Sequence, residues 1–200
     1  MKYPKTAPII LLILANLIPL YGVLFKGWQV FTVMFLYWLE NVIVGFFNVL
    51  KMRSVLHLSR VKNKNKNRPT NLGNDSLILF FIFHFGLFTF VHGVFVMVFF
   101  WPPTMPFLES VFVLGSLFLS HGFSYYLNFL GNREYLNTSI DAQMIAPYGR
   151  ILVMHFAILF GGIMVKSSGW GPAAIIVLVG VKIVIDILSH TREHRLFSNV

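Results

Sequence analysis

The sequence predicts an all-α fold, a polytopic bundle of six transmembrane helices. Two features of the composition predict it: 56% of the 200 residues are hydrophobic, and only 12% are charged. A soluble domain of this size needs more charge to cover its surface. In addition, apolar runs of about 20 residues, the length that crosses a bilayer, recur along the chain. One integral membrane domain, residues 1–200, accounts for the whole length.

The predicted spans follow one another through short connections, apart from a long basic loop at residues 51–75 and a polar connection at residues 131–146. The first span contains Pro19, which favours a kink. The fifth begins directly after Pro147, a residue that suits the first turn of a helix. In chain order the spans cover residues 7–25, 28–50, 77–101, 107–130, 148–166 and 171–190.

Positive charge predicts the orientation of these spans. The N-terminal lysines, the basic loop, Arg133 and the C-terminal arginines fall on one side, whereas Lys26 and Lys166 fall on the other. Basic residues gather at the cytoplasmic ends of spans. The sequence therefore predicts a multi-pass inner-membrane protein with both termini in the cytoplasm. Because much of the net charge of +9 lies in one loop beside two spans, it predicts contact with membrane lipids and argues against nucleic acid.

An acidic residue lies in the middle of the second span, within Tyr37-Trp38-Leu39-Glu40-Asn41. A charged side chain at the centre of a membrane helix costs roughly 2.5–3.5 kcal/mol. Glu40 is therefore expected to face other helices or a wet cavity and to have partners there. The alternative is a protonated carboxyl group that only holds helices together.

Several histidines also fall inside the predicted spans. With a rise of about 1.5 Å per residue, His84 and His155 lie roughly 10 Å below the cytoplasmic face. By the same arithmetic, His121 and Glu40 lie roughly 14–15 Å deep. Imidazole and carboxylate groups that converge in a dry bundle are typical ligands of Zn²⁺, Fe²⁺ or Mn²⁺. The sequence predicts a divalent metal ion in the cytoplasmic half, bound by members of the set Glu40, His84, His121, His155, Asp186 and His190.

Such a metal ion would activate water or oxygen on a lipophilic substrate, which predicts a metal-dependent intramembrane enzyme. Glu40 and Arg150 are the candidate catalytic residues. Arg150 follows Pro147 at the start of the fifth span, where it would clamp an anionic group or extend to the headgroups. His92 would line the outward part of the cavity. Asp186 lies four residues after Lys182, so an ion pair within one helix is the alternative for that carboxylate.

Three other functions stay open. A haem-binding electron carrier would use His84 and His155, at equal depth, as axial ligands. A channel or proton-coupled transporter would use Glu40 and the histidines as a relay. A structural subunit would use the same groups only to hold helices together. The sequence contains neither Gly-x-Ser-x-Gly nor His-Glu-x-x-His, so it gives no support to a serine hydrolase or a zincin.

Four polar segments carry a resemblance: Trp38–Asn48, His84–Gly93, Pro147–His155 and Asp186–His190. Together they resemble an uncharacterised family of small prokaryotic integral membrane proteins, a domain of unknown function. The resemblance covers most of the chain. It implies that these polar positions are a signature of the family, and it implies no activity.

Overall fold

The computed structural model describes residues 21–65, 73–100, 107–168 and 180, and in these ranges every regular element is helical. The all-α prediction is therefore confirmed for the described part of the chain. The helices are α2 (Val30–Asn65), α3 (Gly73–Phe100), α4 (Phe107–Phe123), the π-helix η1 (Ser124–Gly131), the 3₁₀-helix η2 (Glu134–Asn137), α5 (Ile140–Ile145) and α6 (Tyr148–Ser168).

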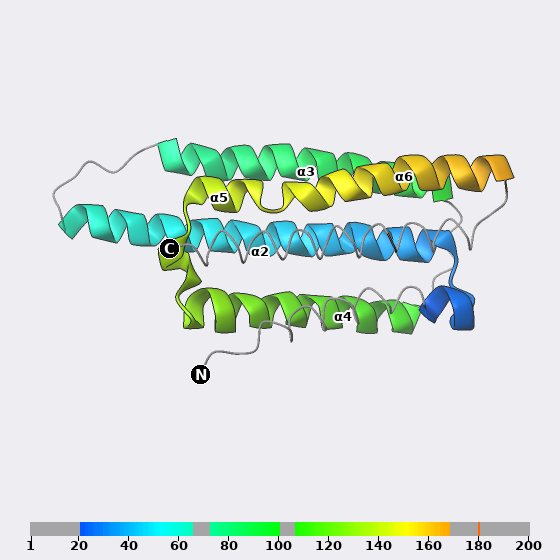
Figure 1. Ribbon diagram of the computed structural model, residues 1–200, viewed down its shortest axis with the longest axis horizontal. Coiled ribbons are helices and arrows are strands. Elements are labelled where there is room, and N and C mark those ends of the chain that lie inside the picture. Colours follow the sequence, from blue (N-terminus) through cyan, green and yellow to red (C-terminus); the bar gives the residue numbers. More distant parts are fainter. Residues whose placement is uncertain (1–20, 66–72, 101–106, 169–179, 181–200) are drawn as a thin grey trace.

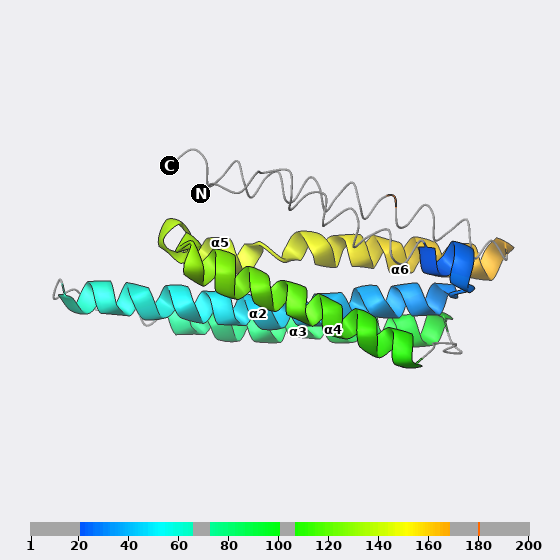
Figure 2. The ribbon, with the colours of Figure 1, turned by 90° about the horizontal axis from the view of Figure 1, so that it is seen from below.

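Helix α2 is the central element of the bundle. It packs against α3, α4, α5 and α6. Figure 1 shows it between α4 on one side and α3 with α6 on the other, and in Figure 2 α4 crosses in front of it at an angle. Helices α2 and α4 run in one direction, whereas α3 and α6 run in the other (Figure 1). Short α5 leads into α6 along nearly the same line, with Pro147 between them. Segments that carry polar residues on α2, α3 and α6 thus lie side by side.

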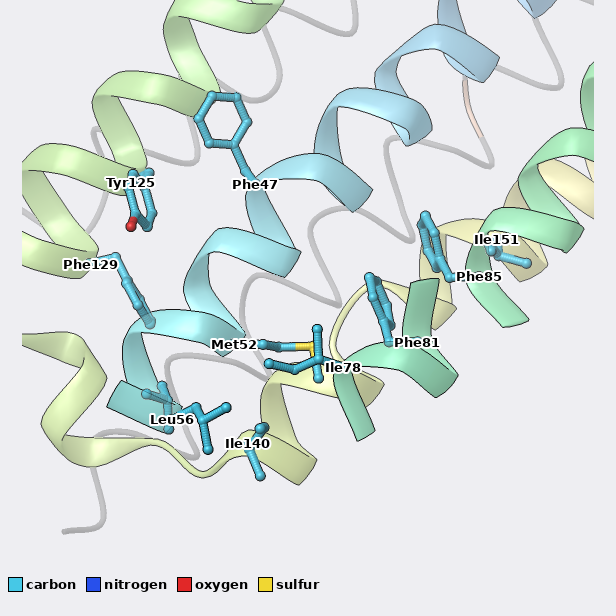
Figure 3. Close-up of a cluster of buried hydrophobic side chains, with 11 residues drawn as sticks. Phe47, Met52, Leu56, Ile78, Phe81, Phe85, Tyr125, Phe129, Ile140 and Ile151 are labelled. Carbon is cyan, nitrogen blue, oxygen red and sulfur yellow. The ribbon is translucent and has the colours of Figure 1, made fainter. Parts of the chain in front are cut away.

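Two groups of buried apolar side chains hold these helices together. The first joins the beginning of α2 to the ends of α3 and α6, and it contains Phe31, Met34, Tyr37, Val96, Phe100, Met154 and Ile158. The second lies near the other end of α2, where α3, η1 and α5 meet it (Figure 3), and it contains Phe47, Met52, Leu56, Ile78, Phe81, Phe85, Tyr125, Phe129 and Ile140.

Among the described residues, three segments are long and apolar enough to cross a membrane: Val30–His57, Asp75–Phe100 and Ile140–Ile163. Helix α3 also presents large apolar side chains outward, and Phe83 is 77% exposed. Such a surface is costly in water and suits contact with lipid. These helices suggest that the protein associates with a membrane.

The structure thus describes three such helices, not the six that the sequence predicts. The predicted spans 28–50, 77–101 and 148–166 correspond to α2, α3 and α6. Helix α4 has 17 residues, and the wider turns of η1 continue it to Gly131, so the chain is helical across the predicted span 107–130 without one long α-helix there. The first and sixth predicted spans lie outside the described residues, except for residues 21–25 and 180.

The prediction of a loop from residue 51 was wrong, because α2 continues through the basic segment to Asn65. The sequence interpretation ended the span at the first charge, Lys51. Lysine and arginine are good helix formers, and Met52, Val55 and Leu56 give the extension a buried face. The Lys51 ammonium also lies over the ring of Phe129, 5.4 Å from its centre. Residues 66–72 of the predicted loop lie outside the described residues.

Two glycines inside helices differ in the space around them. A Cβ added at Gly45 of α2 would lie 2.6 Å from the buried ring of Phe85, whereas one at Gly86 of α3 would meet nothing within 4 Å. Gly45→Ala is expected to lower the free energy of unfolding by about 1–3 kcal/mol, because the ring has to move. Gly86→Ala is the matched control, and it is expected to raise the same quantity by about 0.5–1 kcal/mol through helix propensity. Thermal unfolding in detergent checks both, and equal effects would contradict the packing described.

Candidate functional site

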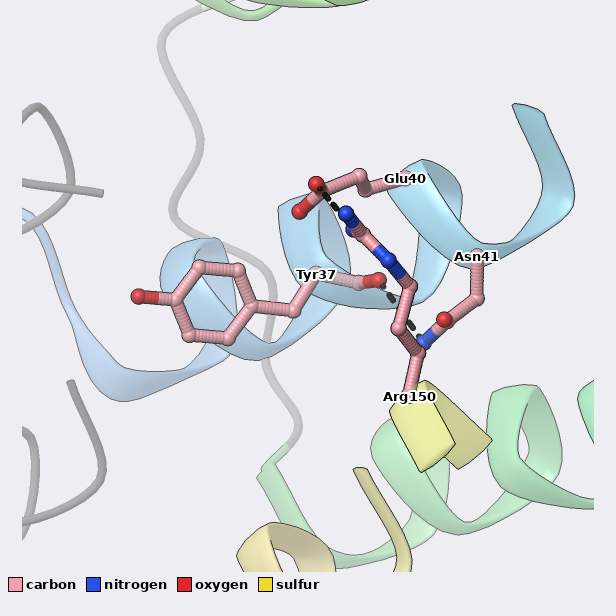
Figure 4. Close-up of polar contacts among 4 residues, drawn as sticks. All are labelled: Tyr37, Glu40, Asn41 and Arg150. Atoms are coloured by element: carbon pink, nitrogen blue, oxygen red, sulfur yellow. Dashed lines mark hydrogen bonds and ion pairs between the residues drawn. The ribbon is translucent and has the colours of Figure 1, made fainter. Parts of the chain in front are cut away.

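An ion pair joins α2 to α6 in the apolar part of the bundle. Nη1 of Arg150 lies 2.8 Å from Oε1 of Glu40, and the two side chains point toward each other (Figure 4). The side chain of Glu40 is 14% exposed and that of Arg150 is 26% exposed. At this distance the contact is a charge-assisted hydrogen bond. It neutralises both charges inside segments that are apolar enough to cross a membrane.

The break between α5 and α6 sets the position of Arg150. Arg150 lies in the first turn of α6, where its backbone N–H donates to the carbonyl of Pro147 over 3.1 Å. On the α5 side of the break, buried Asn48 of α2 donates from Nδ2 to the carbonyl of Gln143 over 2.9 Å. The α5–α6 segment is therefore attached to α2 by a polar contact on each side of Pro147.

Two histidines from different helices form a second polar pair. Nε2 of His92 on α3 lies 3.2 Å from Nδ1 of His155 on α6. His92 is only 2% exposed. A hydrogen bond between two imidazoles requires one ring to donate and the other to accept. The pair therefore shares a proton between two helices in a buried position.

A third pair joins the same two helices nearer the beginning of α6. Nδ1 of His84 lies 2.9 Å from the hydroxyl oxygen of Tyr148. The ring of Phe88 lies between the two histidines of α3, 5.0 Å from the ring centre of His84 and 6.4 Å from that of His92. An aromatic side chain thus separates the two histidine sites.

The three pairs are stacked along α6. Tyr148 and His155 are seven residues apart, which places them on nearly the same face of the helix, toward α3. Arg150 lies between them in height and points to α2. From Tyr148 to His155 the helix rises by about 10 Å. The three contacts therefore lie one above another where α2, α3 and α6 meet, and we call them together the polar layer.

The α2–α3 contact is fixed at the same level by Trp38. Its Nε1 donates to the backbone carbonyl of Thr89 over 2.7 Å. The indole also packs on Gly93, where an added Cβ would lie 2.7 Å from the ring. Because Gly93 follows His92 in the chain, this contact holds the backbone that carries the histidine pair.

Of the predicted metal ligands, the structure describes Glu40, His84, His121 and His155, and it does not bring these four together as one group. It places Glu40 beside Arg150 and His155 beside His92. His121 stacks near Phe47, with ring centres 6.4 Å apart, at the contact between α4 and α2. Asp186 and His190 lie outside the described residues. Within the described part of the chain, the structure contains no group of three or more His, Asp or Glu side chains that could hold a metal ion.

The register of α6 explains why His155 meets His92 and not His84. The depth estimate placed the beginning of the fifth span at Tyr148, but the apolar segment begins at Ile140. The segment therefore begins eight residues earlier, and His155 lies about 12 Å deeper than estimated. The same rise separates His84 from His92 on α3, so His155 lies at the depth of His92.

Sequence reasoning gave His92 only a place on the cavity wall and missed Tyr148 as the partner of His84. The useful signal was the similar spacing on two helices. His84 and His92 are eight residues apart, and Tyr148 and His155 are seven apart. Helices that run in the same direction bring both pairs together when their registers match.

The fold and the polar layer define a helical bundle of membrane type, with ionisable groups paired between its apolar helices. The chain belongs to a family of unknown function, DUF6498, whose model matches residues 2–199. This confirms the resemblance to a domain of unknown function. Searches of curated proteins and of solved structures found no match.

Removal of one partner of the ion pair is expected to destabilise the fold. Glu40→Gln and Arg150→Gln should each lower the free energy of unfolding by about 3 kcal/mol, because each leaves a charge in apolar surroundings. The double variant should lose less than the sum of the two, with a coupling of about 1 kcal/mol or more. Unfolding of the protein in detergent measures all three values.

The exposed Glu134 supplies the control, since Glu134→Gln is expected to change the free energy of unfolding by less than about 0.5 kcal/mol. Strictly additive effects of the Glu40 and Arg150 variants would contradict a direct interaction between the two charges.

Proposed function

We propose that the protein is a six-span inner-membrane protein, with both termini in the cytoplasm, whose polar layer transfers protons in a proton-coupled transporter or channel. The observation that carries the proposal is the 3.2 Å contact between His92 and His155. An imidazole ring can donate a proton from one nitrogen while it accepts one at the other. When Nδ1 of His92 takes up a proton, the proton on Nε2 can pass to Nδ1 of His155, and His155 then releases the proton on its own Nε2. One proton thus moves from α3 to α6, and both rings are neutral again.

The ion pair supports the same function. Glu40 is an acidic residue in an apolar helix, and such residues often serve as proton carriers in membrane proteins. Uptake of a proton by Glu40 would remove its attraction for Arg150 and free α6 from α2. Proton binding would in this way be coupled to movement of a helix.

The ring of Phe88 gives this pathway a barrier. It contacts both His84 and His92, so a proton can pass between these two sites only when the ring moves or water enters. The barrier keeps the site formed by His84 and Tyr148 separate from the site formed by His92 and His155. Such separation is what prevents an uncontrolled leak in a coupled transporter.

Proton flux into liposomes with a pH-sensitive dye inside tests this function. His92→Gln and His155→Gln are expected to lower the flux by about 10- to 100-fold, because each removes a proton-transfer group. His121→Gln is the matched control on α4, and it should keep wild-type flux. A folded wild-type protein without flux, or His92 and His155 variants with unchanged flux, would contradict the proposal.

Metal binding at His92 and His155 is a second candidate, and a specific distance favours it. Two imidazole nitrogens on one tetrahedral Zn²⁺ lie about 3.3 Å apart, given Zn–N distances of about 2.0–2.1 Å. The two nitrogens lie 3.2 Å apart. A metal ion held by these two residues would keep coordination positions for water or a substrate.

Metal content of the purified protein separates the two functions. The metal candidate predicts close to one equivalent in the wild type and in His121→Gln, and its loss in both His92→Gln and His155→Gln. Elemental analysis of samples with the same thermal stability measures this. Metal that stays in the His92 and His155 variants would rule out this site.

The proposed topology is testable because the chain contains no cysteine. Lys26 and Glu134 are both exposed, and the proposal places them on opposite sides of the membrane. A membrane-impermeant maleimide is expected to label Lys26→Cys in intact cells, but Glu134→Cys only after the cells are permeabilised. Labelling of both positions in intact cells would contradict the six-span arrangement.

A further inference from the structure

A pocket of about 520 Å³ lies between α2 and the beginning of α3, away from the three polar pairs. We name it the Arg53–Asp75 pocket. Its lining combines charged and apolar side chains: Arg53, Leu56, His57, Asp75, Ile78 and Leu79. No step of the proton or metal chemistry described above uses these residues, so the pocket is separate from the polar pairs.

The position of the pocket along the helices limits that occupant. The apolar segment of α2 ends at His57, and that of α3 begins at Asp75. Both residues line the pocket. It therefore lies at the level where two apolar helices reach the polar headgroup layer of a membrane.

The charges around the pocket fit a ligand that carries both signs. Arg53 and His57 are four residues apart, so they lie on the same side of α2. Arginine and histidine side chains donate hydrogen bonds, and arginine is well suited to phosphate. Asp75 of α3 adds a carboxylate to the same lining, which would repel a simple anion and attract an ammonium group.

The apolar part of the lining fits the remainder of a lipid. Leu56 and Ile78 are each 6% exposed, whereas Leu79 is 57% exposed. Phe83, one turn further along α3, is 77% exposed. From the pocket, an apolar strip thus continues along the outward face of α3, where acyl chains would lie.

We propose that the Arg53–Asp75 pocket binds the phosphoethanolamine headgroup of a membrane phospholipid. Arg53 and His57 hold the phosphate, Asp75 accepts the ammonium group, and the acyl chains follow α3 from Leu79. The proposal is independent of the function of the polar layer, because it uses different residues.

Native mass spectrometry of the full-length protein in detergent tests the pocket. The probes are phosphatidylethanolamine, phosphatidylcholine and phosphatidylglycerol with identical acyl chains, together with soluble phosphoethanolamine. Phosphatidylethanolamine is expected to bind about three- to fivefold more tightly than the other two lipids, because one additional charge contact, that of Asp75 with the ammonium group, gives a gain of this size near the surface. Soluble phosphoethanolamine, which has no acyl chains, is expected to bind most weakly.

Variants assign this preference to the pocket. Asp75→Asn should abolish the preference over phosphatidylcholine, whose quaternary ammonium group has no N–H to donate. Arg53→Gln should weaken the binding of all three lipids. Arg53→Lys keeps the positive charge and should keep part of the affinity, and it takes the place of Arg53→Gln in the test if that variant does not fold. Lys26→Gln, which removes an exposed charge before the beginning of α2, at the opposite end of that helix, should leave binding unchanged. Equal affinity for the ethanolamine and choline lipids, a preference that persists in Asp75→Asn, or equal binding of soluble phosphoethanolamine would overturn the proposal.

Discussion

The ion pair between Glu40 and Arg150 is the constraint on which the rest of the bundle depends. Either charge alone would be costly in an apolar helix that is long enough to cross a membrane. Contact at 2.8 Å offsets part of that cost, provided that α6 keeps one height and one rotation relative to α2. Once these are set, Tyr148 and His155 face α3, and the two histidine contacts follow from the spacing of the sequence.

The polar contacts matter more here than they would in a soluble bundle. Between helices in lipid, burial of apolar surface gives little driving force, so close packing and interhelical hydrogen bonds decide the arrangement. Each pair among α2, α3 and α6 is joined by at least one such contact. Trp38 binds the Thr89 carbonyl, Glu40 binds Arg150, and His92 with His155 and His84 with Tyr148 join α3 to α6. Protonation of a group in one of these contacts therefore affects how the other two pairs of helices pack.

Much of this arrangement follows from the sequence, but the register of α6 relative to α3 does not. Hydropathy predicted α2, α3 and α6, and the cost of a buried charge predicted that Glu40 has partners. Arg150 was expected to clamp an anionic group or to reach the headgroups. It pairs with Glu40 instead. Its position depends on α5, a short helix within the segment that the sequence predicted as a polar connection. Helix α5 shifts α6 by eight residues, so a comparison of depths alone paired the wrong histidines. The extension of α2 past Lys51 was missed because hydropathy detects the apolar layer and not the end of a helix.

The central claim is that His92 and His155 share one proton in the middle of the polar layer. NMR of the protein in detergent, with ¹⁵N-labelled histidine, tests it most directly, because a hydrogen bond between two ring nitrogens gives a scalar coupling between them. The account predicts a coupling between Nε2 of His92 and Nδ1 of His155 that disappears in His155→Gln. Two uncoupled rings whose N–H protons exchange freely with water would contradict it.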